Sequence, residues 1–466
     1  MKRLSWLQWR SEMLATIVLA VPIAGAQLAQ IALQVVDNMM CGRLGAQSLA
    51  GVGLGSAVLA TLLLPLLGIV GIISAFISES EGQQVASEVP RRFFQQGLYL
   101  ALILGVPATL VLGHAPELLR WSGQQEVLVA IAERYLDTVR WCIVPALLLG
   151  VLKTTLDSVS RPQPGFWIAI SGIVFNVFAN QILMFGGWGD RLWFAPLGVA
   201  GTGWATALTN VWMMILLAGF LAWDRRLQAY GFFKRFVPIS WPMILQLWRT
   251  GAPVGVSILS EVGLFAGMTF LMGYMSHTAL AAHQIALNVA SLTFMCALGV
   301  SYATTVRVGG AMGAKDPEKA RRAGGLGMLL GILIMGGAGL LFWLMPAQIV
   351  GLYLDLGDPE NRAVLALGGH LLQLAALFQV FDALQVTSQG GLRGLKDTFV
   401  PMIIGFCCYW CIGLGSGVFL GFGLNWGARG LWMGLILGLA SASLLLCRRF
   451  FRFFVSAVRP SRDVLS

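Results

Sequence analysis

Residues 62–77 read LLLPLLGIVGIISAFI, a run of sixteen residues without one charged side chain. A membrane-spanning α-helix needs about 20 mainly apolar residues, and the apolar character extends on the N-terminal side to residue 50. A strand of a transmembrane barrel would alternate apolar and polar residues over about ten positions, and this run does not alternate. The stretch is therefore predicted to be a transmembrane helix, since a helix satisfies its own backbone hydrogen bonds in lipid.

The composition of the whole chain indicates an integral membrane protein. Of 466 residues, 57% are hydrophobic and 11% are charged, and the mean hydropathy is +0.77, whereas about 25% of residues are charged in a soluble domain. Because so few charges cannot cover a surface exposed to water, the composition excludes a soluble enzyme, a disordered scaffold and a secreted disulfide-rich protein. The net charge of +10 would also suit a nucleic-acid-binding protein, but the positions of the charges favour membrane loops.

Apolar stretches of similar length recur along the chain and predict an all-α integral membrane fold with twelve transmembrane helices. Their approximate cores are residues 14–36, 50–77, 94–112, 128–151, 166–186, 196–222, 247–272, 279–305, 325–345, 364–389, 399–422 and 430–447. If both termini are cytoplasmic, 24 of the 31 Lys and Arg residues fall in inner segments and 7 in outer ones. Since Lys and Arg accumulate on the cytoplasmic side, we expect a multi-pass protein of the plasma membrane, the inner membrane of a bacterial cell, with both termini in the cytoplasm.

The sequence divides into two related halves. The longest polar interruption, residues 223–241, lies near the middle, and a shift of 231 positions aligns Pro22 with Pro253 and Gly42 with Gly273. Backbone-altering residues therefore match in corresponding spans, which predicts two pseudo-symmetric six-helix bundles around a central cleft. The predicted boundaries are an N-terminal lobe at 1–223, a cytoplasmic linker at 224–245, a C-terminal lobe at 246–447 and a basic cytoplasmic tail at 448–466.

Three acidic residues fall inside predicted spans: Asp37, Glu261 and Asp382. An ionised carboxylate near the bilayer centre costs about 2.5–3.5 kcal/mol, so it normally faces a cavity, a partner or an ion. No Lys or Arg lies within a helical turn or two of Glu261 or Asp382 in the sequence. We expect these carboxyl groups to bind and release a cation, either a proton or an oxygen-preferring ion such as Na⁺. The alternatives are that a protonated carboxyl bonds a neighbouring backbone carbonyl, and that Asp37 lies at the membrane interface.

Polar amides close to these acids are candidates for lining a substrate cavity. They are Gln34, Asn176, Asn180, Gln284 and Asn288. The pairs in the fifth and eighth spans are spaced four residues apart, so each pair lies on one helix face. Such pairs can equally hold neighbouring helices together, and both interpretations remain open. His283 could titrate, although a packing role is favoured, and the seven cysteines are interpreted as packing thiols.

Three groups of residues carry the pattern of a known family. They are residues 282–289 (AHQIALNV) with 291–295 (SLTFM) and 305–309 (TVRVG), residues 381–385 (FDALQ) with 391–398 (GLRGLKDT), and Val36–Asp37 with Gly42. In these residues the chain resembles the multidrug and toxic compound extrusion (MATE) transporters, most closely their NorM-type branch. The resemblance covers essentially all twelve spans and implies two six-helix lobes around a cleft, with efflux of cationic, amphipathic drugs driven by inward Na⁺ or H⁺ flow.

The resemblance also implies roles for particular residues. In NorM-type members, acidic residues in the seventh and tenth spans form the cation site, and the matching positions are Glu261 and Asp382, a candidate Na⁺ site. An aspartate in the first span, here Asp37, is implicated in proton coupling or drug interaction. NorM-type sites commonly place a tyrosine one turn before the tenth-span aspartate, where this chain has Phe378, a further cavity candidate. The lost hydroxyl leaves the choice between Na⁺ and H⁺ open.

The expected function is therefore secondary active antiport by a monomer in membrane lipid, with small cationic substrates, no nucleic-acid partner and no cofactor. ATP is not implied, because the sequence has no GxxxxGK[ST] phosphate-binding loop. Export of a lipid-linked or polysaccharide precursor, as by related flippases, is the alternative, but it would call for basic residues in the cleft. An enzyme would need a clustered His/Asp/Glu motif, which the four scattered histidines do not supply. A passive channel would show no uphill transport.

Overall fold

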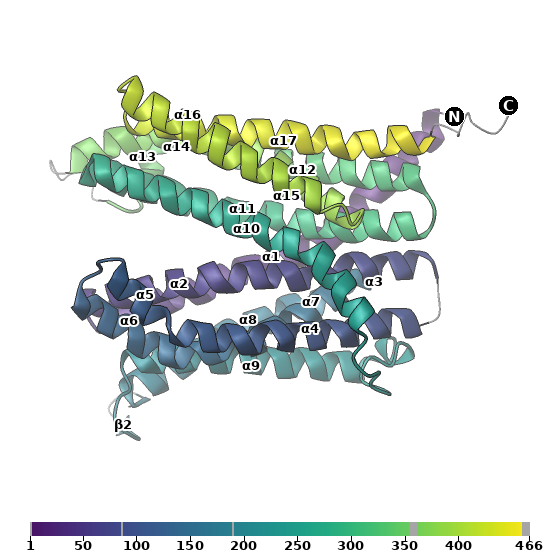
Figure 1. Ribbon diagram of the computed structural model, residues 1–466, viewed down its shortest axis with the longest axis horizontal. Helices are drawn as coiled ribbons and strands as arrows, with labels where there is room; N and C mark the ends of the chain where they lie inside the picture. Colours follow the sequence, from purple (N-terminus) through teal and green to yellow (C-terminus); the bar gives the residue numbers. More distant parts are fainter. Residues whose placement is uncertain (1, 85–86, 189–190, 355–360, 459–466) are drawn as a thin grey trace. The chain divides into compact units, whose positions relative to one another are not determined.

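The protein is described by a computed structural model that covers residues 2–84, 87–188, 191–354 and 361–458 (Figure 1). Within these residues, twelve helical segments are long and apolar enough to cross a membrane. The only strands among them are β1 (Gly187–Trp188) and β2 (Arg191–Leu192), which pair antiparallel. This confirms the predicted fold class of an all-α membrane protein with twelve spans.

The spans are built from the following helices. The first six are α1 (Lys2–Gly42), α2 (Ala46–Gly71) with α3 (Ile73–Gly82), α4 (Glu88–Gly113), α6 (Glu126–Val139) with α7 (Ile143–Ser158), α8 (Gln163–Phe185) and α9 (Val199–Trp223). The last six are α10 (Trp241–Met275), α11 (His277–Gly313), α12 (Pro317–Leu344), α14 (Arg362–Gly394), α15 (Phe399–Phe406) continuing into α16 (Gly415–Val418), and α17 (Ala428–Val458). Between or within these spans lie two short helices, α5 (Ala115–Trp121) and α13 (Pro346–Val350). Two 3₁₀ turns lie there as well, at Arg140–Cys142 and Leu227–Ala229.

The eleventh span is irregular. Between α15 and α16 it adopts a π-helix over Cys407–Leu414, and a second π-helical segment follows α16 at Phe419–Gly423. π-Helical turns are rare and frequently occur at functional sites. The wider turn changes the direction in which the side chains of this span leave the backbone.

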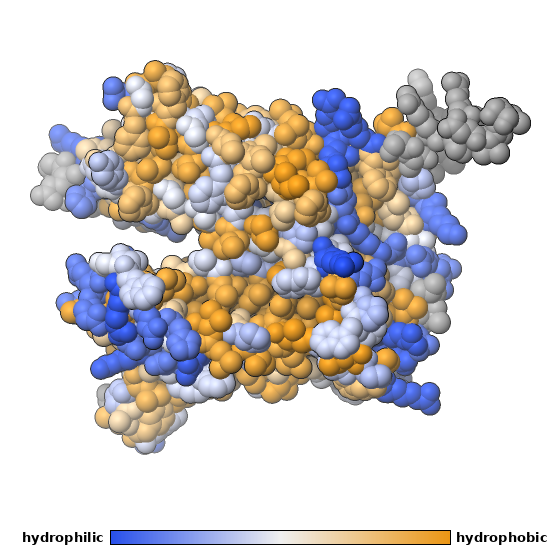
Figure 2. All heavy atoms as spheres, in the orientation of Figure 1, coloured by the Kyte–Doolittle hydropathy of each residue, from blue (hydrophilic) through white to orange (hydrophobic). Residues whose placement is uncertain are grey.

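The surfaces of the helices fit a lipid environment. Large apolar side chains such as Val18, Leu110, Phe270 and Leu333 are exposed. Figure 2 shows apolar residues over the middle of the helices and hydrophilic residues toward their ends. This distribution is expected where helix midsections contact hydrocarbon and helix ends contact water.

The described chain forms two compact units, one of residues 25–255 and one of residues 1–24 with 256–466. The units differ from the predicted lobes 1–223 and 246–447, because the first part of α1 packs with the second half of the chain. Leu19, Ala20 and Ile23 are buried against apolar residues of α11. Nearby, Arg307 on α11 donates from Nε to Glu12 Oε1 at 2.9 Å. These contacts fix residues 12–23 of α1 on α11.

The first part of α10, up to Gly255, correspondingly packs in the unit of residues 25–255. A Cβ added to Gly255 would lie 2.8 Å from Ile69 Cγ1 and 2.9 Å from the Pro65 carbonyl oxygen. Only glycine therefore allows α10 to approach α2 this closely. Gly255 is the residue aligned with Ala24 by the shift of 231 positions, so the internal repeat seen in the sequence is reflected in the packing.

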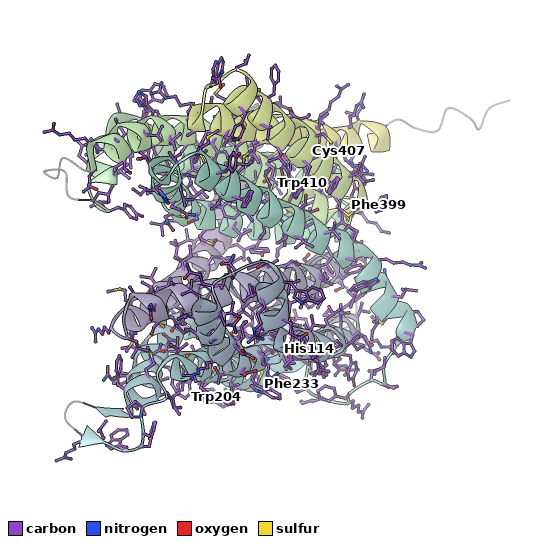
Figure 3. All side chains as sticks on the ribbon, turned by 60° about the vertical axis from the view of Figure 1, so that its left-hand side comes forward. His114, Trp204, Phe233, Phe399, Cys407 and Trp410 are labelled. Carbon is purple, nitrogen blue, oxygen red and sulfur yellow. The ribbon has the colours of Figure 1, made fainter. Side chains whose placement is uncertain are left out.

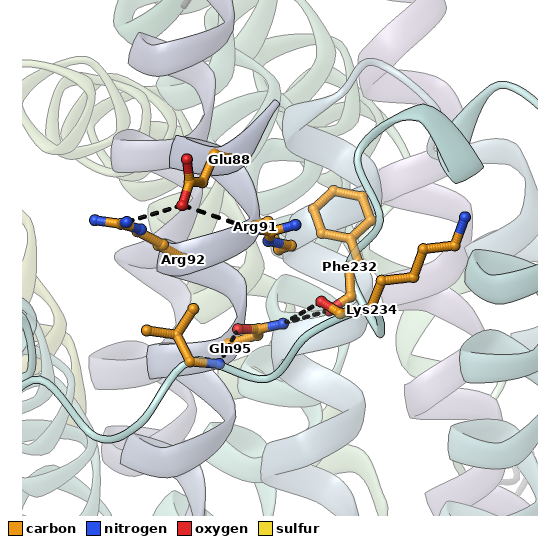
Figure 4. Close-up of polar contacts among 7 residues, drawn as sticks. Glu88, Arg91, Arg92, Gln95, Phe232 and Lys234 are labelled. Atoms are coloured by element: carbon orange, nitrogen blue, oxygen red, sulfur yellow. Dashed lines mark hydrogen bonds and ion pairs between the residues drawn. The ribbon is translucent and has the colours of Figure 1, made fainter. Parts of the chain in front are cut away.

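The segment predicted as a linker, residues 224–245, follows a defined path along α4 (Figure 4). The buried Gln95 amide donates to the Phe232 carbonyl at 2.9 Å and accepts from the Val237 amide at 3.0 Å. Gln96 makes the same pair of bonds to the linker backbone, at 3.1 and 2.9 Å. Each glutamine therefore replaces a donor and an acceptor that an irregular segment would otherwise lack.

The segment predicted as a basic tail begins as a helix, because α17 continues to Val458. Phe450 is fully buried against Gly324 on α12 and Gly391 on α14. Arg449 forms a bidentate ion pair with Asp397, with N–O distances of 2.6 and 3.0 Å. These contacts extend the helix beyond the predicted end of the C-terminal lobe at residue 447.

Candidate functional site

Glu261 and Asp382 line one cavity in the unit that contains residues 256–466. Helix α10 carries Glu261, α14 carries Asp382, and the cavity has a volume of about 230 Å³. The other lining residues come from α10, α11 and α14: Phe265, Leu287, Asn288, Ala290, Ser291, Phe294 and Phe378. The structure thus brings together the two acidic residues singled out in the seventh and tenth spans, on a mainly apolar surface.

The environment of the two carboxyl groups is unfavourable for isolated negative charge. Asp382 is 4% exposed, and it interacts electrostatically with Glu261. A buried ionised group is costly unless it is paired, and two neighbouring carboxylates disfavour each other's ionised form. The site therefore needs a positive partner whenever both groups are ionised, which a proton, a metal cation or a cationic ligand can supply.

A basic residue also acts on this site, although none is close in sequence. Arg393 on α14 interacts electrostatically with Glu261. Its guanidinium donates to Ser301 Oγ at 3.3 Å and lies 5.7 Å from the centre of the Tyr302 ring. Arg393 follows Asp382 by eleven residues, which is three turns of an α-helix. That spacing was the available signal for placing both residues on one face.

Phe378 forms part of an aromatic wall of the cavity. It is 3% exposed and contacts Phe265 and Trp432 edge-on, with ring centres 6.2 and 5.8 Å apart. The ring thus packs where the resemblance leads one to expect a tyrosine. The wall on this side of the cavity is aromatic and carries no hydroxyl from position 378.

His283 contacts Trp432, which packs against Phe378 in this aromatic wall. Trp432 donates from Nε1 to His283 Nδ1 at 3.2 Å, and His283 Nε2 is 3.2 Å from Thr269 Oγ1. Because an indole N–H can only donate, Nδ1 must accept and Nε2 must carry the hydrogen. Thr269 uses its own hydrogen on the Phe265 carbonyl, so its oxygen accepts from Nε2. This arrangement gives a neutral, fixed imidazole in a packing role.

The π-helical segment of the eleventh span contributes two polar contacts that sequence reasoning missed. The Tyr409 hydroxyl accepts from Gln385 Nε2 at 2.5 Å, three residues beyond Asp382 on α14. Trp410, labelled in Figure 3, donates from Nε1 to Ser260 Oγ at 2.9 Å, next to Glu261 on α10. Adjacent residues of one segment thus contact both helices that carry the acids. Tyr409 also interacts electrostatically with Glu261 and Asp382.

The predicted amide candidates differ in their positions. Asn288 lines the cavity, whereas Gln284, one turn earlier on α11, is exposed and does not line it. Gln34 is an exposed residue of α1 in the other unit. A helix face is too wide to tell from spacing alone which member of an i,i+4 pair reaches a cavity.

Asp37 lies in a second polar cluster, in the unit of residues 25–255. It accepts from Asn180 Nδ2 at 2.6 Å and from Thr206 Oγ1 at 2.9 Å. Asn180 Nδ2 also donates to Asn176 Oδ1 at 3.0 Å, and both asparagines are fully buried. The structure thus joins the predicted pair on α8 to the first-span aspartate, and adds Thr206 of α9, which the sequence did not indicate. The side-chain oxygen Oδ1 of Asn180 is buried without a hydrogen-bond partner.

Both clusters offer oxygen atoms to a cation. Among the described residues, no three His, Cys, Asp or Glu side chains form a group that could hold a metal ion. A hard cation at either cluster would therefore take amide and hydroxyl oxygens in addition to carboxylates, a ligand set that such ions accept. A proton would need only one carboxylate oxygen.

Comparison with known proteins identifies the family. The sequence profile of the MatE family matches residues 22–182 and 253–419. The chain is 35% identical to a probable multidrug resistance protein NorM of Brucella suis biovar 1, covering 97% of this chain and 96% of the relative. It is 37% identical to the multidrug resistance protein NorM of Burkholderia vietnamiensis, covering 93% and 92% of the two chains.

A solved structure shares the fold. The outward-facing conformation of a multidrug resistance MATE family transporter of the MOP superfamily matches with a TM-score of 0.85 at 20% sequence identity, over 96% of this chain and 97% of that one. At this identity the likeness concerns the fold alone. Together with the family profile and the near full-length relatives, the twelve-span architecture shows that this chain is a member of the MatE family of membrane transporters and not an enzyme.

Proposed function

We propose that this chain is a secondary active multidrug efflux transporter, which exports cationic, amphipathic compounds in exchange for Na⁺ or H⁺. It works as a monomer without ATP. The observation that carries the proposal is the placement of Glu261 and Asp382 in one largely apolar cavity of about 230 Å³. The names of the NorM relatives as multidrug resistance proteins support the choice of cargo.

The exchange follows from competition for negative charge. With both carboxylates ionised, the cavity attracts a cationic compound, and the rings of Phe265, Phe294 and Phe378 supply apolar and cation–π contacts. Binding of Na⁺ or H⁺ removes negative charge and weakens that attraction. Occupancy by the coupling ion and occupancy by the drug therefore oppose each other, and this coupling is reciprocal in binding free energy. The acidic lining works against an anionic lipid-linked cargo.

The cluster at Asp37 is a second place where the coupling ion acts. Asn180 and Thr206 each donate a hydrogen bond to Asp37, while the side-chain oxygen Oδ1 of Asn180 has no hydrogen-bond partner. A cation bound there would be coordinated by one carboxylate and neutral oxygens. The proposal therefore assigns coupling roles to Asp37, Glu261 and Asp382.

The test is uptake of a fluorescent cationic dye into vesicles in which a pH gradient and a Na⁺ gradient are imposed separately. Glu261→Gln and Asp382→Asn should each reduce ion-driven transport to background at unchanged expression, because the amide carries no exchangeable charge. Glu117→Gln, an equivalent change at an exposed residue of α5, should leave transport unchanged. Undiminished transport in either of the first two variants would remove that residue from the mechanism.

The proposed location is the plasma membrane, the inner membrane of a bacterial cell, with both termini cytoplasmic. The support is the 24 to 7 distribution of Lys and Arg between the two sides. A fluorescent protein fused to the C-terminus should fold and fluoresce on the cytoplasmic side. A periplasmic alkaline phosphatase fused at the same point should stay inactive, and its activity would reverse the orientation.

A further inference from the structure

Buried polar atoms without hydrogen-bond partners gather on α14. The described part of the chain has seven such side-chain atoms, and four of them belong to this helix: Gln379 Oε1, Gln385 Oε1, Ser388 Oγ and Gln389 Nε2. An unpaired buried polar group destabilises the folded state, so native proteins leave few of them. A concentration on one helix is therefore a feature that needs a physical explanation.

Three of these residues, Gln385, Ser388 and Gln389, lie within about 120° of Asp382 around the helix axis and on the same side of it, whereas Gln379 lies about 60° to the other side. With 3.6 residues per turn, Gln389 and Arg393 follow Asp382 after about two and three turns and share its face. Gln379 and Gln385 lie one turn before and one turn after Asp382. From Asp382 to Arg393 the row extends over about 16 Å of helix axis. One end meets the cavity at Asp382.

The orientation of the first amide is fixed by its neighbour. Thr293 on α11 donates its hydroxyl hydrogen to the Ala290 carbonyl at 2.9 Å. Its oxygen can therefore only accept, and it accepts from Gln379 Nε2. The free end of the Gln379 side chain is consequently the carbonyl oxygen, a group that water or a cation satisfies.

The positively charged guanidinium of Arg393 lies at the other end of the row. Arg393 is held by Ser301 Oγ and by its own helix at the Gln389 carbonyl, 3.4 Å away, and it lies over the Tyr302 ring. A fixed guanidinium repels cations and is one of the devices by which transport proteins block their passage. The row thus has an acidic mouth and a basic end.

We propose that the cavity at Glu261 and Asp382 continues as a water-filled track along α14, past Gln385, Ser388 and Gln389, and that it ends at Arg393. Buried waters normally bind polar groups that would otherwise lack partners, and the unpaired atoms of Gln385, Ser388 and Gln389 supply such groups. The track keeps a small monovalent cation hydrated on the inner side of Asp382 while Arg393 prevents it from passing through. Its role in coupling rests on the proposed antiport function, but its hydration does not.

Cysteine reactivity tests the track, because a thiol reacts as the thiolate, which forms in a hydrated environment and not in dry packing. Ser388→Cys changes one atom in the proposed track. Ala383→Cys is the matched control, since Ala383 is fully buried on the same helix in the apolar cluster with Ala297 and Met335. Gln389→Cys is a second track variant in case the first does not fold.

The full-length protein in lipid nanodiscs is treated with 2-aminoethyl methanethiosulfonate, a small cationic thiol reagent, without any ion gradient. The tryptic peptide of residues 363–393 contains no native cysteine, so its mass reports on the introduced thiol alone. We expect Ser388→Cys or Gln389→Cys to react about tenfold or more faster than Ala383→Cys. Equal, slow reaction at all three positions would overturn the track, whereas failure of the antiport would appear only in the dye assay.

Discussion

Gln385 donates its side-chain amide to the Tyr409 hydroxyl at 2.5 Å, and both residues are fully buried. The bond joins the π-helical segment of the eleventh span to α14 one turn beyond Asp382. The same segment bonds to α10 through Trp410 and Ser260. The spacing of the two acid-bearing helices is therefore controlled from a third span that carries no acid itself.

Removing the Tyr409 hydroxyl should weaken cation binding at Glu261 and Asp382 without abolishing it. Tyr409→Phe leaves the Gln385 amide with neither end paired, which costs about 1–3 kcal/mol. We expect a lower thermal stability of the purified protein and about a tenfold weaker ion dependence of dye transport, since 1.4 kcal/mol corresponds to a factor of ten. Tyr353→Phe, at a 48% exposed residue, is the control. Ion dependence equal to that of the wild type would show that Tyr409 only packs.

The cluster at Asp37 offers a matched pair of threonines on α9. Thr206 donates to the Asp37 carboxylate at 2.9 Å, whereas Thr209 donates to the Ala205 carbonyl within its own helix at 2.7 Å. Thr206→Val removes a hydrogen bond to a group that can be charged, worth about 1.5–3 kcal/mol. We expect at least a tenfold change in the ion concentration for half-maximal transport. Thr209→Val should leave it within about twofold, and equal effects of the two changes would argue against a coupling role for Asp37.

Arg393 should act as a barrier to uncoupled ion flow. At an effective dielectric constant of about 20, two positive unit charges about 10 Å apart repel each other by about 1.7 kcal/mol. A cation at that distance from the Arg393 guanidinium would therefore have its occupancy lowered by more than a factor of ten. Arg393→Gln should therefore raise the substrate-independent leak of Na⁺ or H⁺ into vesicles by about tenfold. Arg321→Gln, which removes an exposed ion pair with Glu318, is the control for general loss of charge. A leak no larger than that of the control would contradict the barrier.

Tyr230 in the segment of residues 224–245 should make the stability of the folded protein depend on pH in the alkaline range. Tyr230 donates to Glu81 Oε2 at 2.7 Å, and burial together with this hydrogen bond raises the pKa of Tyr230. The folded protein then keeps the phenol proton where the unfolded chain, with a pKa of about 10, releases it. This contribution to stability is complete below about pH 9 and declines as the pH rises above about 10.

The corresponding measurement compares the unfolding of wild type and Tyr230→Phe from about pH 8 to about pH 11. The variant lacks the titrating group, so the stability difference between the two proteins should shrink across this range. A difference that stays constant would mean that the Tyr230 hydroxyl titrates equally in the folded and unfolded chains.

Hydropathy and charge predict much of this protein because both are local properties. An acidic residue in an apolar run is visible in the sequence, and its cost in lipid singles out Glu261 and Asp382 before any contact is known. The contacts of Gln379, Gln385 and Tyr409 are not visible, because an amide or a phenol in a span is equally compatible with ordinary helix packing. Their partners lie on other helices, so only the tertiary arrangement reveals them.

Charge counting also has a limit that Lys153 illustrates. It is grouped with the loop charges in the sequence, yet it lies inside α7. There its ammonium group donates to Gln27 on α1. A long side chain can reach a polar partner from within a span, so the residue number of a lysine does not fix the depth of its charge.

The shared helices α1 and α10 have a consequence for any attempt to divide the protein. If the chain were cut within residues 224–245, the N-terminal fragment would carry residues 1–24, which belong to the compact unit of the other fragment, and the C-terminal fragment would carry residues 246–255, which belong to the first. Each piece alone would lack a packing element and expose the surface that normally receives it. The two fragments should therefore accumulate only when they are co-expressed. On reassembly, residues 1–24 of one fragment would pack with the other fragment, and residues 246–255 of the other would pack with the first.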